Sequence, residues 1–399
     1  MTDPGLQALR DLATVFLKLG ATAFGGPAAH IALMRDEVVQ RRKWMTEQQF
    51  LDLIGATNLI PGPNSTEMAI HIGHARAGWR GLLVAGSCFI LPASLIVAAI
   101  AWAYIRFGTL PEARAFLYGI KPVIISIVVL ALGRLVRTAV KSARLGALGL
   151  AAVAAVLLGV NEILVLVAAG TVAALAQRVA RGTPRGPSAV SILAALVAGP
   201  ATRSGATPGR VALLAAGAAS GAGAATAVSL GQLFLVFFKS GALLFGSGYV
   251  LLAFLRADLV ERLGWLSETQ LLDAVAVGQV TPGPVFTTAT FIGYVLGGAP
   301  GAFIATVGIF LPAFVYVAAS APILPRLRQS TLAAAVLDGV NVASMALMVV
   351  VTWQLGLAAL IDPLTIGIAI VSGALLLWNR LNSVWLILAG GGLGLLVGA

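Results

Sequence analysis

The sequence predicts an all-α polytopic membrane protein made of two homologous halves. Of its 399 residues, 59% are hydrophobic and only 10% are charged, and the mean hydropathy is +0.97. A soluble domain has about 25% charged residues, so this chain has too few charges to cover a surface exposed to water. Apolar windows of about 18–25 residues, long enough to span a bilayer, recur along the whole chain.

The second half of the chain repeats the first. The stretch from Phe24-Gly25-Gly26-Pro27 to Pro61-Gly62-Pro63 returns 221 residues later, from Phe245-Gly246-Ser247-Gly248 to Pro282-Gly283-Pro284. Beyond the second Pro-Gly-Pro the offset is 220, as Leu91-Pro92 and Leu311-Pro312 show. A duplicated unit with helix-breaking residues inside apolar segments is typical of membrane transporters built from repeats.

The apolar windows predict six helices in each half. In the first half they cover 7–34, 50–74, 79–105, 113–135, 145–160 and 162–178, and their counterparts cover 229–256, 271–296, 301–321, 331–351, 356–377 and 382–398. Residues 181–227 form a linker whose last run, 211–227, is just long enough to span. We therefore expect an N-terminal repeat at 1–180, a C-terminal repeat at 228–399, and about 12–13 transmembrane helices.

Loop charges indicate that the two halves run in opposite directions. One side of the first half holds Arg76, Arg80, Arg134, Arg137, Lys141, Arg144, Arg178, Arg181 and Arg185. In the second half the positive charges lie in the loops that correspond to the opposite side of the first half. These loops hold Arg256, Arg262, Arg326, Arg328 and Arg380. Because positive loops face the cytoplasm, this reversal predicts an inverted repeat, although Arg41, Arg42 and Lys43 lie on the disfavoured side.

The Pro-Gly-Pro motifs predict broken helices and an anion site. Proline removes a backbone donor and disfavours α geometry in the residue before it, so the 50–74 segment cannot be one continuous helix. Asn64 and Ser65 are suited to cap the helix that restarts. Its first N–H groups lack partners within the helix, and its dipole end is positive, which favours an anion. A proline kink without a ligand is the simpler alternative, but the second copy makes it less attractive.

The glycine-rich turns that begin with Phe24 and Phe245 break the first helix of each half in the same way. Lys18 and Lys239 precede them by six residues, and a lysine inside an apolar helix usually faces a cavity or a partner, or extends to the membrane interface. The candidate substrate-binding residues are Lys18, Phe24, Gly25, Gly26, Asn58, Pro61, Gly62, Pro63, Asn64, Ser65, Lys239, Phe245, Gly246, Ser247, Gln279, Pro282, Gly283 and Pro284.

Charged residues near the breaks are candidates for coupling or gating. Asp52 and Asp273 lie near the start of the broken helices and would repel an anion unless they take up a proton or pair with Arg35 and Arg256. A salt bridge that fixes the charged loop to the helix end is an equally good interpretation. Glu37 joins this set, because the repeat keeps its charge as an aspartate.

Several function classes are excluded. The net charge of +11 follows the loop pattern of a membrane protein rather than a nucleic-acid surface. The single cysteine, Cys88, excludes a multi-cysteine metal site, and His71 and His74 are too few ligands for a metal. No phosphate-binding loop indicates ATP, and no catalytic triad or H-E-x-x-H motif supports an intramembrane enzyme. We expect no cofactor.

Taken together, the paired motifs resemble those of the chromate ion transporter family. The resemblance rests on Phe24-Gly25-Gly26-Pro27, the stretch from Arg35 to Trp44, Asp52, Asn58 and Pro61-Gly62-Pro63 with their second copies, and it covers nearly the whole chain. It implies efflux of chromate across the inner membrane, driven by the proton gradient or the membrane potential, with sulfate as a structural analogue. Sulfate transport, including uptake, and a homodimeric state stay open. The second copy departs at Ser247-Gly248 and Gln279, so the halves need not contribute equally.

Overall fold

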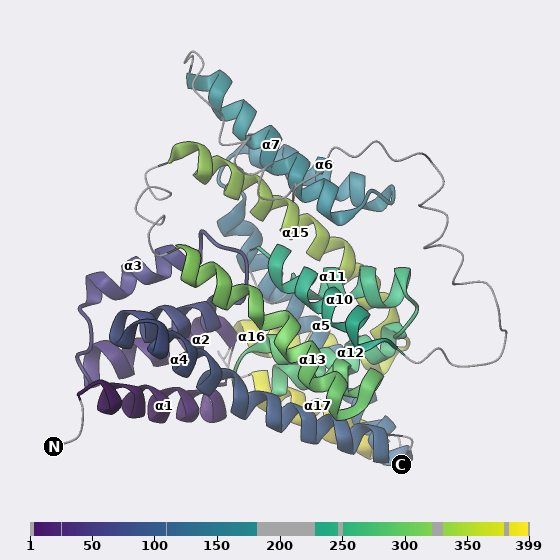
Figure 1. Ribbon diagram of the computed structural model, residues 1–399. Helices are drawn as coiled ribbons and strands as arrows, with labels where there is room; N and C mark the ends of the chain where they lie inside the picture. Colours follow the sequence, from purple (N-terminus) through teal and green to yellow (C-terminus); the bar gives the residue numbers. More distant parts are fainter. Residues whose placement is uncertain are drawn as a thin grey trace, which may run out of the picture.

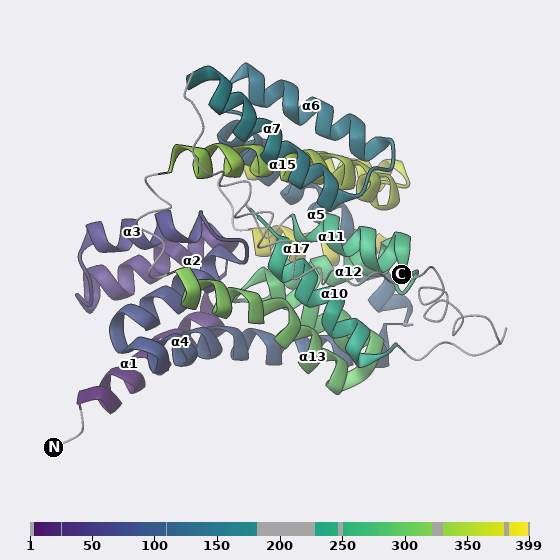
Figure 2. The same cartoon turned by 45° about the horizontal axis from the view of Figure 1, so that its top comes forward.

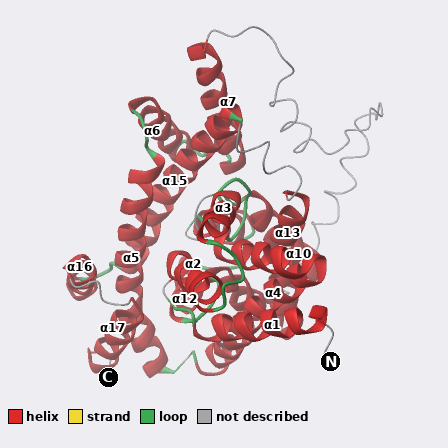
Figure 3. Cartoon of the chain, turned by 90° about the vertical axis from the view of Figure 1, so that its left-hand side faces the viewer, coloured by secondary structure: helices red, strands yellow, loops and turns green. Residues whose placement is uncertain are grey.

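The computed structural model describes residues 4–24, 26–108, 110–181, 228–245, 250–320, 330–378 and 383–397. Throughout these ranges the regular structure is helical and no strand occurs (Figure 3). The first half contains α1 (Pro4–Thr22), α2 (Gly26–Arg35), the π-helix η1 (Asp36–Arg41), α3 (Glu47–Thr57), α4 (Asn64–Phe107), α5 (Pro111–Ala139), α6 (Ala143–Leu157) and α7 (Glu162–Arg181).

The second half repeats this order. It contains α10 (Leu230–Leu243), α11 (Leu251–Leu255), the π-helix η2 (Arg256–Arg262), α12 (Glu268–Val280), the short 3₁₀-helix η3 (Val285–Thr287), α13 (Thr288–Ser320), α15 (Thr331–Ala359), α16 (Pro363–Trp378) and α17 (Ser383–Val397). The expected spanning run at 211–227 lies outside the described residues.

The helix breaks occur where the sequence predicts them. The predicted segment 50–74 divides into α3 and the start of α4, and 271–296 divides into α12 and α13. In addition, α4 turns sharply at Gly78 and α13 at Gly298, where φ is +59° and +62°. Only glycine adopts this conformation without strain.

One predicted boundary is wrong. The apolar windows predict a helix end at 351 and the next helix start at 356, whereas α15 continues to Ala359 and α16 begins at Pro363. Asp362 fixes this start, since its Oδ1 accepts the Thr365 N–H at 2.9 Å and Thr365 Oγ1 accepts the Asp362 N–H at 3.1 Å. Apolar composition alone did not mark the boundary, because both helices are apolar on every side.

By length and composition, five of the described helical segments can each cross a membrane. They lie in α4, α5, α7, α13 and α15, and α6, α10, α16 and α17 are shorter apolar helices. Many large apolar side chains on these helices are exposed, among them Trp102, Trp353 and Trp378. In a soluble protein such a surface would aggregate, whereas lipid covers it readily. The chain is a multi-pass membrane protein.

The helices form two layers. In Figure 3, α5, α6 and α7 lie with α15, α16 and α17 in one layer, and α1–α4 lie with α10–α13 in the other. Figures 1 and 2 show α6 and α7 running beside α15, a helix of the other half. The layer of α1–α4 and α10–α13 contains all four breaks that the motifs predict, which lie between α1 and α2, α3 and α4, α10 and α11, and α12 and α13.

Small residues let helices of opposite halves approach closely. A Cβ added at Gly119 of α5 would overlap the carbonyl oxygen of Gly390 in α17, and one added at Gly339 of α15 would overlap the carbonyl oxygen of Ala169 in α7. Gly339 is the repeat counterpart of Gly119. Equivalent contacts therefore join each half to the other, as in close helix packing in membranes generally.

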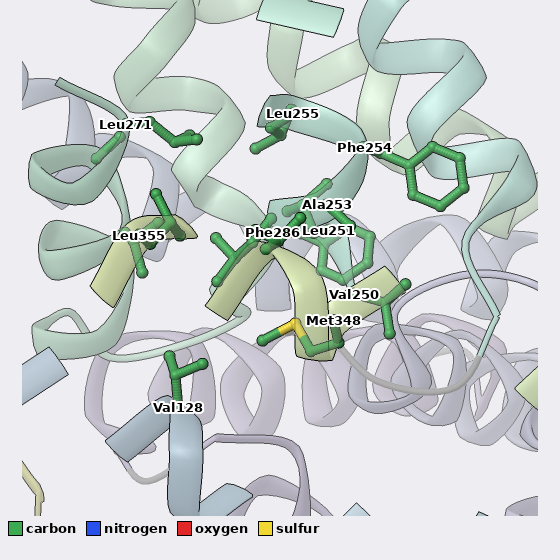
Figure 4. Packing of buried hydrophobic residues seen from close by; sticks show 14 of the residues in the cluster. Val128, Val250, Leu251, Ala253, Phe254, Leu255, Leu271, Phe286, Met348 and Leu355 are labelled. Atoms are coloured by element: carbon green, nitrogen blue, oxygen red, sulfur yellow. The ribbon is translucent and has the colours of Figure 1, made fainter. Parts of the chain in front are cut away.

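The largest apolar core lies where the layers meet. All five residues of α11 are buried, and Figure 4 shows Leu251 and its neighbours facing Met348 and Leu355 of α15. Val128 of α5 and Leu271 of α12 belong to the same cluster. The broken region of the second half is thus held against helices of both halves.

Replacing Gly119 with alanine should destabilise the protein by about 1–3 kcal/mol, because the added Cβ would overlap the backbone of α17. Denaturant titration of the protein in detergent measures this change. Gly133→Ala is the matched control on the same helix, since nothing lies within 4 Å of its added Cβ. It should be neutral or stabilising by up to about 1 kcal/mol. Equal stability of the two variants would contradict the packing described for α5 and α17.

Candidate functional site

The first Pro-Gly-Pro motif separates α3 from α4. A capping box formed by Thr46 and Gln49 starts α3, and the helix ends at Asn58. Gly62 then adopts φ +139°, and Pro63 in extended geometry is the residue that precedes α4. The helix restarts at Asn64. The Thr66 and Glu67 N–H groups donate to the Pro63 carbonyl oxygen at 2.8 and 3.0 Å, so the donors that this restart presents are the N–H groups of Asn64 and Ser65.

The second motif forms an equivalent break. Ser267 and Gln270 make the same capping box at the start of α12, which ends at Thr281. Gly283 has φ +88°, and a single 3₁₀ turn leads into α13. Pro282, Gly283 and Pro284 are all buried, whereas Pro61 of the first motif is partly exposed.

Each break is held by a backbone hydrogen bond to the other half. The Gly62 N–H donates to the carbonyl oxygen of Leu244 at 2.8 Å, and the Gly283 N–H donates to that of Ala23 at 2.8 Å. Ala23 and Leu244 are repeat counterparts that immediately precede the glycine-rich turns. Each Pro-Gly-Pro break is therefore joined to the end of the first helix of the other half, and both glycine N–H groups are already engaged.

The glycine-rich turns are described only in part. Gly25, Gly246 and Ser247 lie outside the described residues, as does Gly248. Phe24 is 38% exposed, whereas Phe245 packs against the largest apolar core. Gly26 begins α2 with φ +77°, and no atom lies within 4 Å of a Cβ built on it.

The two lysines before these turns pair with carboxylates. Lys18 Nζ lies 3.1 Å from Glu37 Oε1, and Lys239 pairs with Asp258, the counterpart of Glu37. Arg41 and Arg42 also contact Glu37, at 3.3 and 3.5 Å. Burial alone would raise the pKa of Glu37, but its hydrogen bond with Lys18 and the charges of the three cations together lower that pKa below its ordinary value.

Arg35 and Arg256, which were considered as partners of Asp52 and Asp273, pair with glutamates instead. Arg35 Nε donates to Glu47 Oε1 at 2.7 Å, and Arg256 Nε donates to Glu268 Oε2 at 3.2 Å. These equivalent ion pairs tie the π-helical segments to the starts of α3 and α12. The arginines thus fix the charged loop to the helix end as considered above, but the carboxylates are Glu47 and Glu268 and not the two aspartates.

Asp273 instead joins a triad that sequence reasoning missed. Its Oδ1 lies 3.1 Å from Lys121 Nζ of α5, and its Oδ2 accepts the Tyr104 hydroxyl of α4 at 2.9 Å. Lys121 is a lysine inside an apolar helix, the same signal that singled out Lys18. Asp52, by contrast, is exposed on α3, although it too has an interaction partner.

A polar cavity of about 470 Å³ opens beside the first break. Its lining includes Asn58 and Asn64 of the break, Thr138 and Lys141 near the end of α5, and Asn341 of α15. The Asn64 amide donates to Asn58 Oδ1 at 3.0 Å, and Lys141 pairs with Asp338 at 2.6 Å on the exposed side. The lining thus combines amide and hydroxyl groups, a balanced Lys141–Asp338 pair and apolar side chains, and the donors beside the N-terminus of α4 are suited to an anion.

A larger cavity of about 530 Å³ adjoins the charged segment of the second half. Lys239 and Arg256 line it, but so do Asp258, Glu261 and Glu162. The carboxylates balance the cations here, and the Lys239 and Arg256 charges are already paired. This cavity therefore suits an anion less well than the one at the first break.

The second break is closed in the same structure. Every residue of α12 from Leu271 to Gln279 is buried, whereas in α3 only Phe50, Ala56 and Thr57 are. Asn58 is exposed, but its counterpart Gln279 is only 9% exposed. The first break is therefore more exposed than its equivalent in the second half.

Glu67 is a further residue that sequence reasoning missed. It lies in the first turns of α4, is fully buried, and has no hydrogen-bond partner for either carboxylate oxygen among the described residues. A Cβ built on Gly62 would overlap its Oε1, so the carboxylate lies against the break. The sequence signal that could have found it is a carboxylate four residues after Pro-Gly-Pro. Residues that occur in both halves were favoured as candidates, and the counterpart of Glu67 is the uncharged Thr287.

A helical membrane protein with paired helix breaks at the contact of its two halves, one of them beside a cavity with polar groups, belongs to the class of membrane transport proteins. The model of the chromate transporter family matches residues 10–175 and 231–395, and the chain belongs to that family. The family and its members are named as transport proteins, and this chain is a transport protein rather than an enzyme.

Three relatives align along nearly the whole chain. The "Chromate transport protein" of Pseudomonas aeruginosa is 34% identical over 96% of this chain and 91% of its own length. That of Cupriavidus metallidurans is 32% identical over 96% and 92%, and the "Probable chromate transport protein" of Synechococcus elongatus is 31% identical over 94% and 96%. No solved structure matches the chain significantly.

Proposed function

We propose that this protein is a secondary transporter that exports chromate from the cytoplasm across the plasma membrane, driven by the membrane potential or the proton gradient. The observation that carries the proposal is the polar cavity at the first Pro-Gly-Pro break, in a chain whose family is named for chromate transport. The nearly full-length relatives that carry the same name support the choice of substrate.

In this proposal the N-terminus of α4 holds the oxyanion. The Gly62 N–H is engaged by Leu244, so the donors that follow it, the N–H groups of Asn64 and Ser65, bind the anion. The side-chain amides of Asn58 and Asn64 line the same cavity and supply further donors. Neutral donors suit a cycle that must release its substrate, because a buried fixed cation would hold a dianion too tightly.

Sulfate is the natural competitor. Chromate and sulfate are tetrahedral dianions of similar size, and hydrogen-bond donors from a helix end suit both. A transporter of sulfate or a related oxyanion, acting in uptake, is the alternative function. Flux of labelled chromate into proteoliposomes, with sulfate as competitor and with imposed pH and voltage gradients, separates the two. Sulfate flux that exceeds chromate flux would favour the alternative.

We further propose that the two repeats, 1–180 and 228–399, are inverted and that their breaks open in turn. The loop charges support the inversion, and the open first break opposite a closed second break supports the alternation. The Asp273–Lys121 pair closes the second side in this state. The corresponding positions at the open side are Asp52 and Asn341, which are not an ion pair.

Replacing Asn64 with leucine should lower chromate flux in proteoliposomes by at least about tenfold, because the side chain loses its donor and fills the cavity at the anion site. Gln354→Leu is the matched control, since Gln354 lines the larger cavity near Arg256. Its flux should equal that of the wild type. Unchanged flux in Asn64→Leu, at equal protein content, would remove the first break from the transport path.

Cysteines at Gln40 and at its counterpart Glu261, introduced singly into a Cys88→Ala background, should label from opposite sides of the membrane. Both positions are exposed, and both follow the first broken helix of their half. An impermeant maleimide applied to right-side-out and inside-out vesicles gives the measurement. Labelling of both cysteines from one side would mean that the repeats are parallel.

A further inference from the structure

Glu67 lies in an apolar setting at the contact of the two halves. It is fully buried, and its carboxylate lies against Gly62. An added Cβ at that glycine would also come within 3.7 Å of Ala313 in α13. Ile60, Ile70 and Phe314 belong to the apolar cluster around this contact. The residue belongs to the first turn of α4, about 4.5 Å along the helix axis from Asn64.

Neither carboxylate oxygen of Glu67 has a hydrogen-bond donor among the described residues. A buried carboxylate normally has a cation or several donors, because its charge loses the solvation that water provides. The start of a helix favours a negative charge, but the N–H of Glu67 itself donates to the Pro63 carbonyl oxygen. This environment requires a neutral carboxyl group or a ligand that arrives during the cycle.

The ionisable groups on the surrounding helices do not neutralise it. Tyr316 of α13 lies within electrostatic reach, but its hydroxyl donates to the Ala242 carbonyl oxygen at 3.0 Å. His71 follows one turn later on α4 itself but makes no hydrogen bond to either Glu67 oxygen. The groups on the other neighbouring elements are engaged elsewhere or exposed: Lys18 of α1 with Glu37, His30 of α2 with Ala23, Asp273 of α12 with Lys121, and Asp52 on the exposed face of α3.

The second half lacks this carboxylate. Its counterpart, Thr287, is equally buried, but the Thr287 hydroxyl donates to the Pro284 carbonyl oxygen at 2.8 Å. The threonine is therefore satisfied within its own turn. Of these two equivalent positions, the titratable one lies on the side whose break adjoins the cavity where the oxyanion is proposed to bind.

We propose that Glu67 is the proton-binding site of the transport cycle and carries one proton together with each oxyanion. This inference rests on the proposed function. A dianion at the start of α4 and a negative carboxylate one turn away repel each other. Protonation of Glu67 removes this repulsion, so binding of the anion and binding of the proton favour each other. The proton comes from water on the side where the anion enters and returns to water on the side where it leaves.

The linkage fixes the direction of coupling. A dianion that moves with one proton carries a net charge of minus one, so an inside-negative membrane potential drives it outward. A proton gradient that is alkaline inside opposes this movement. The proposed function allows the membrane potential or the proton gradient as the driving force. If Glu67 carries a proton with the anion, the membrane potential is the one that drives export.

Flux measurements in proteoliposomes test the coupling. With the voltage clamped at zero and at alkaline pH, where chromate stays a dianion, the wild-type equilibrium ratio of chromate across the membrane should shift about tenfold for each unit of pH difference, with chromate accumulating on the alkaline side. Glu67→Gln mimics the protonated form and should transport chromate with no such shift. Glu112→Gln, which alters an exposed carboxylate at the start of α5, should behave as the wild type.

The outcomes are distinguishable. Wild-type flux that ignores pH, that follows a sodium gradient instead, or that accumulates chromate on the acidic side would overturn the proton site. An unaltered pH shift in Glu67→Gln would do the same. Absence of any chromate flux in the wild type would instead overturn the proposed function.

A second measurement does not depend on the folding of a variant. An apolar carbodiimide reacts with protonated carboxyl groups in apolar surroundings, and mass spectrometry locates the adduct. In the wild-type protein Glu67 should be modified, and more rapidly with chromate present than without it. Modification confined to exposed carboxylates such as Glu112 would contradict a protonated Glu67.

Discussion

The reciprocal hydrogen bonds from Gly62 to Leu244 and from Gly283 to Ala23 are the constraint on which the rest of the structure depends. In a membrane, an interrupted helix is tolerated only where its freed backbone groups find partners within the protein. Each half supplies such a partner to the other. Both positions require glycine, since the φ values are positive and added Cβ atoms would overlap Glu67 Oε1 or approach Ala93 Cβ to 2.6 Å. The two halves therefore cannot form their breaks separately.

The duplicated scaffold has diverged in its chemistry while keeping its geometry. The lysine–carboxylate and arginine–glutamate pairs of the π-helical segments recur at equivalent positions in the two halves. The groups around the breaks differ. One side has an exposed Asn58, a polar cavity and Glu67, whose carboxylate has no hydrogen-bond partner within the described part of the chain. The other side has a buried Gln279 and a hydrogen-bonded Thr287. This difference is consistent with one binding side and one closed side in the state described.

The sequence was sufficient to predict the repeat, the four helix breaks and the family, because proline and glycine act locally and the constant offset shows which breaks correspond. It was not sufficient for contacts between the halves. Nothing in the sequence pairs Gly62 with Leu244, or Asp273 with Lys121 rather than Arg256, since these contacts depend on how the layers pack. Glu67 was also missed, because the candidate residues were chosen mainly from those that occur in both halves, and this glutamate occurs in the first half alone.

The central claim is that the oxyanion binds at the first break, at the contact of the two halves. An experimental structure with bound chromate tests it most directly, because chromium scatters strongly enough to locate the ion. The account predicts the ion beside the N-terminus of α4, within hydrogen-bond distance of Asn64. An ion bound among Lys239, Arg256 and Arg262 in the larger cavity, with the first break empty, would contradict it.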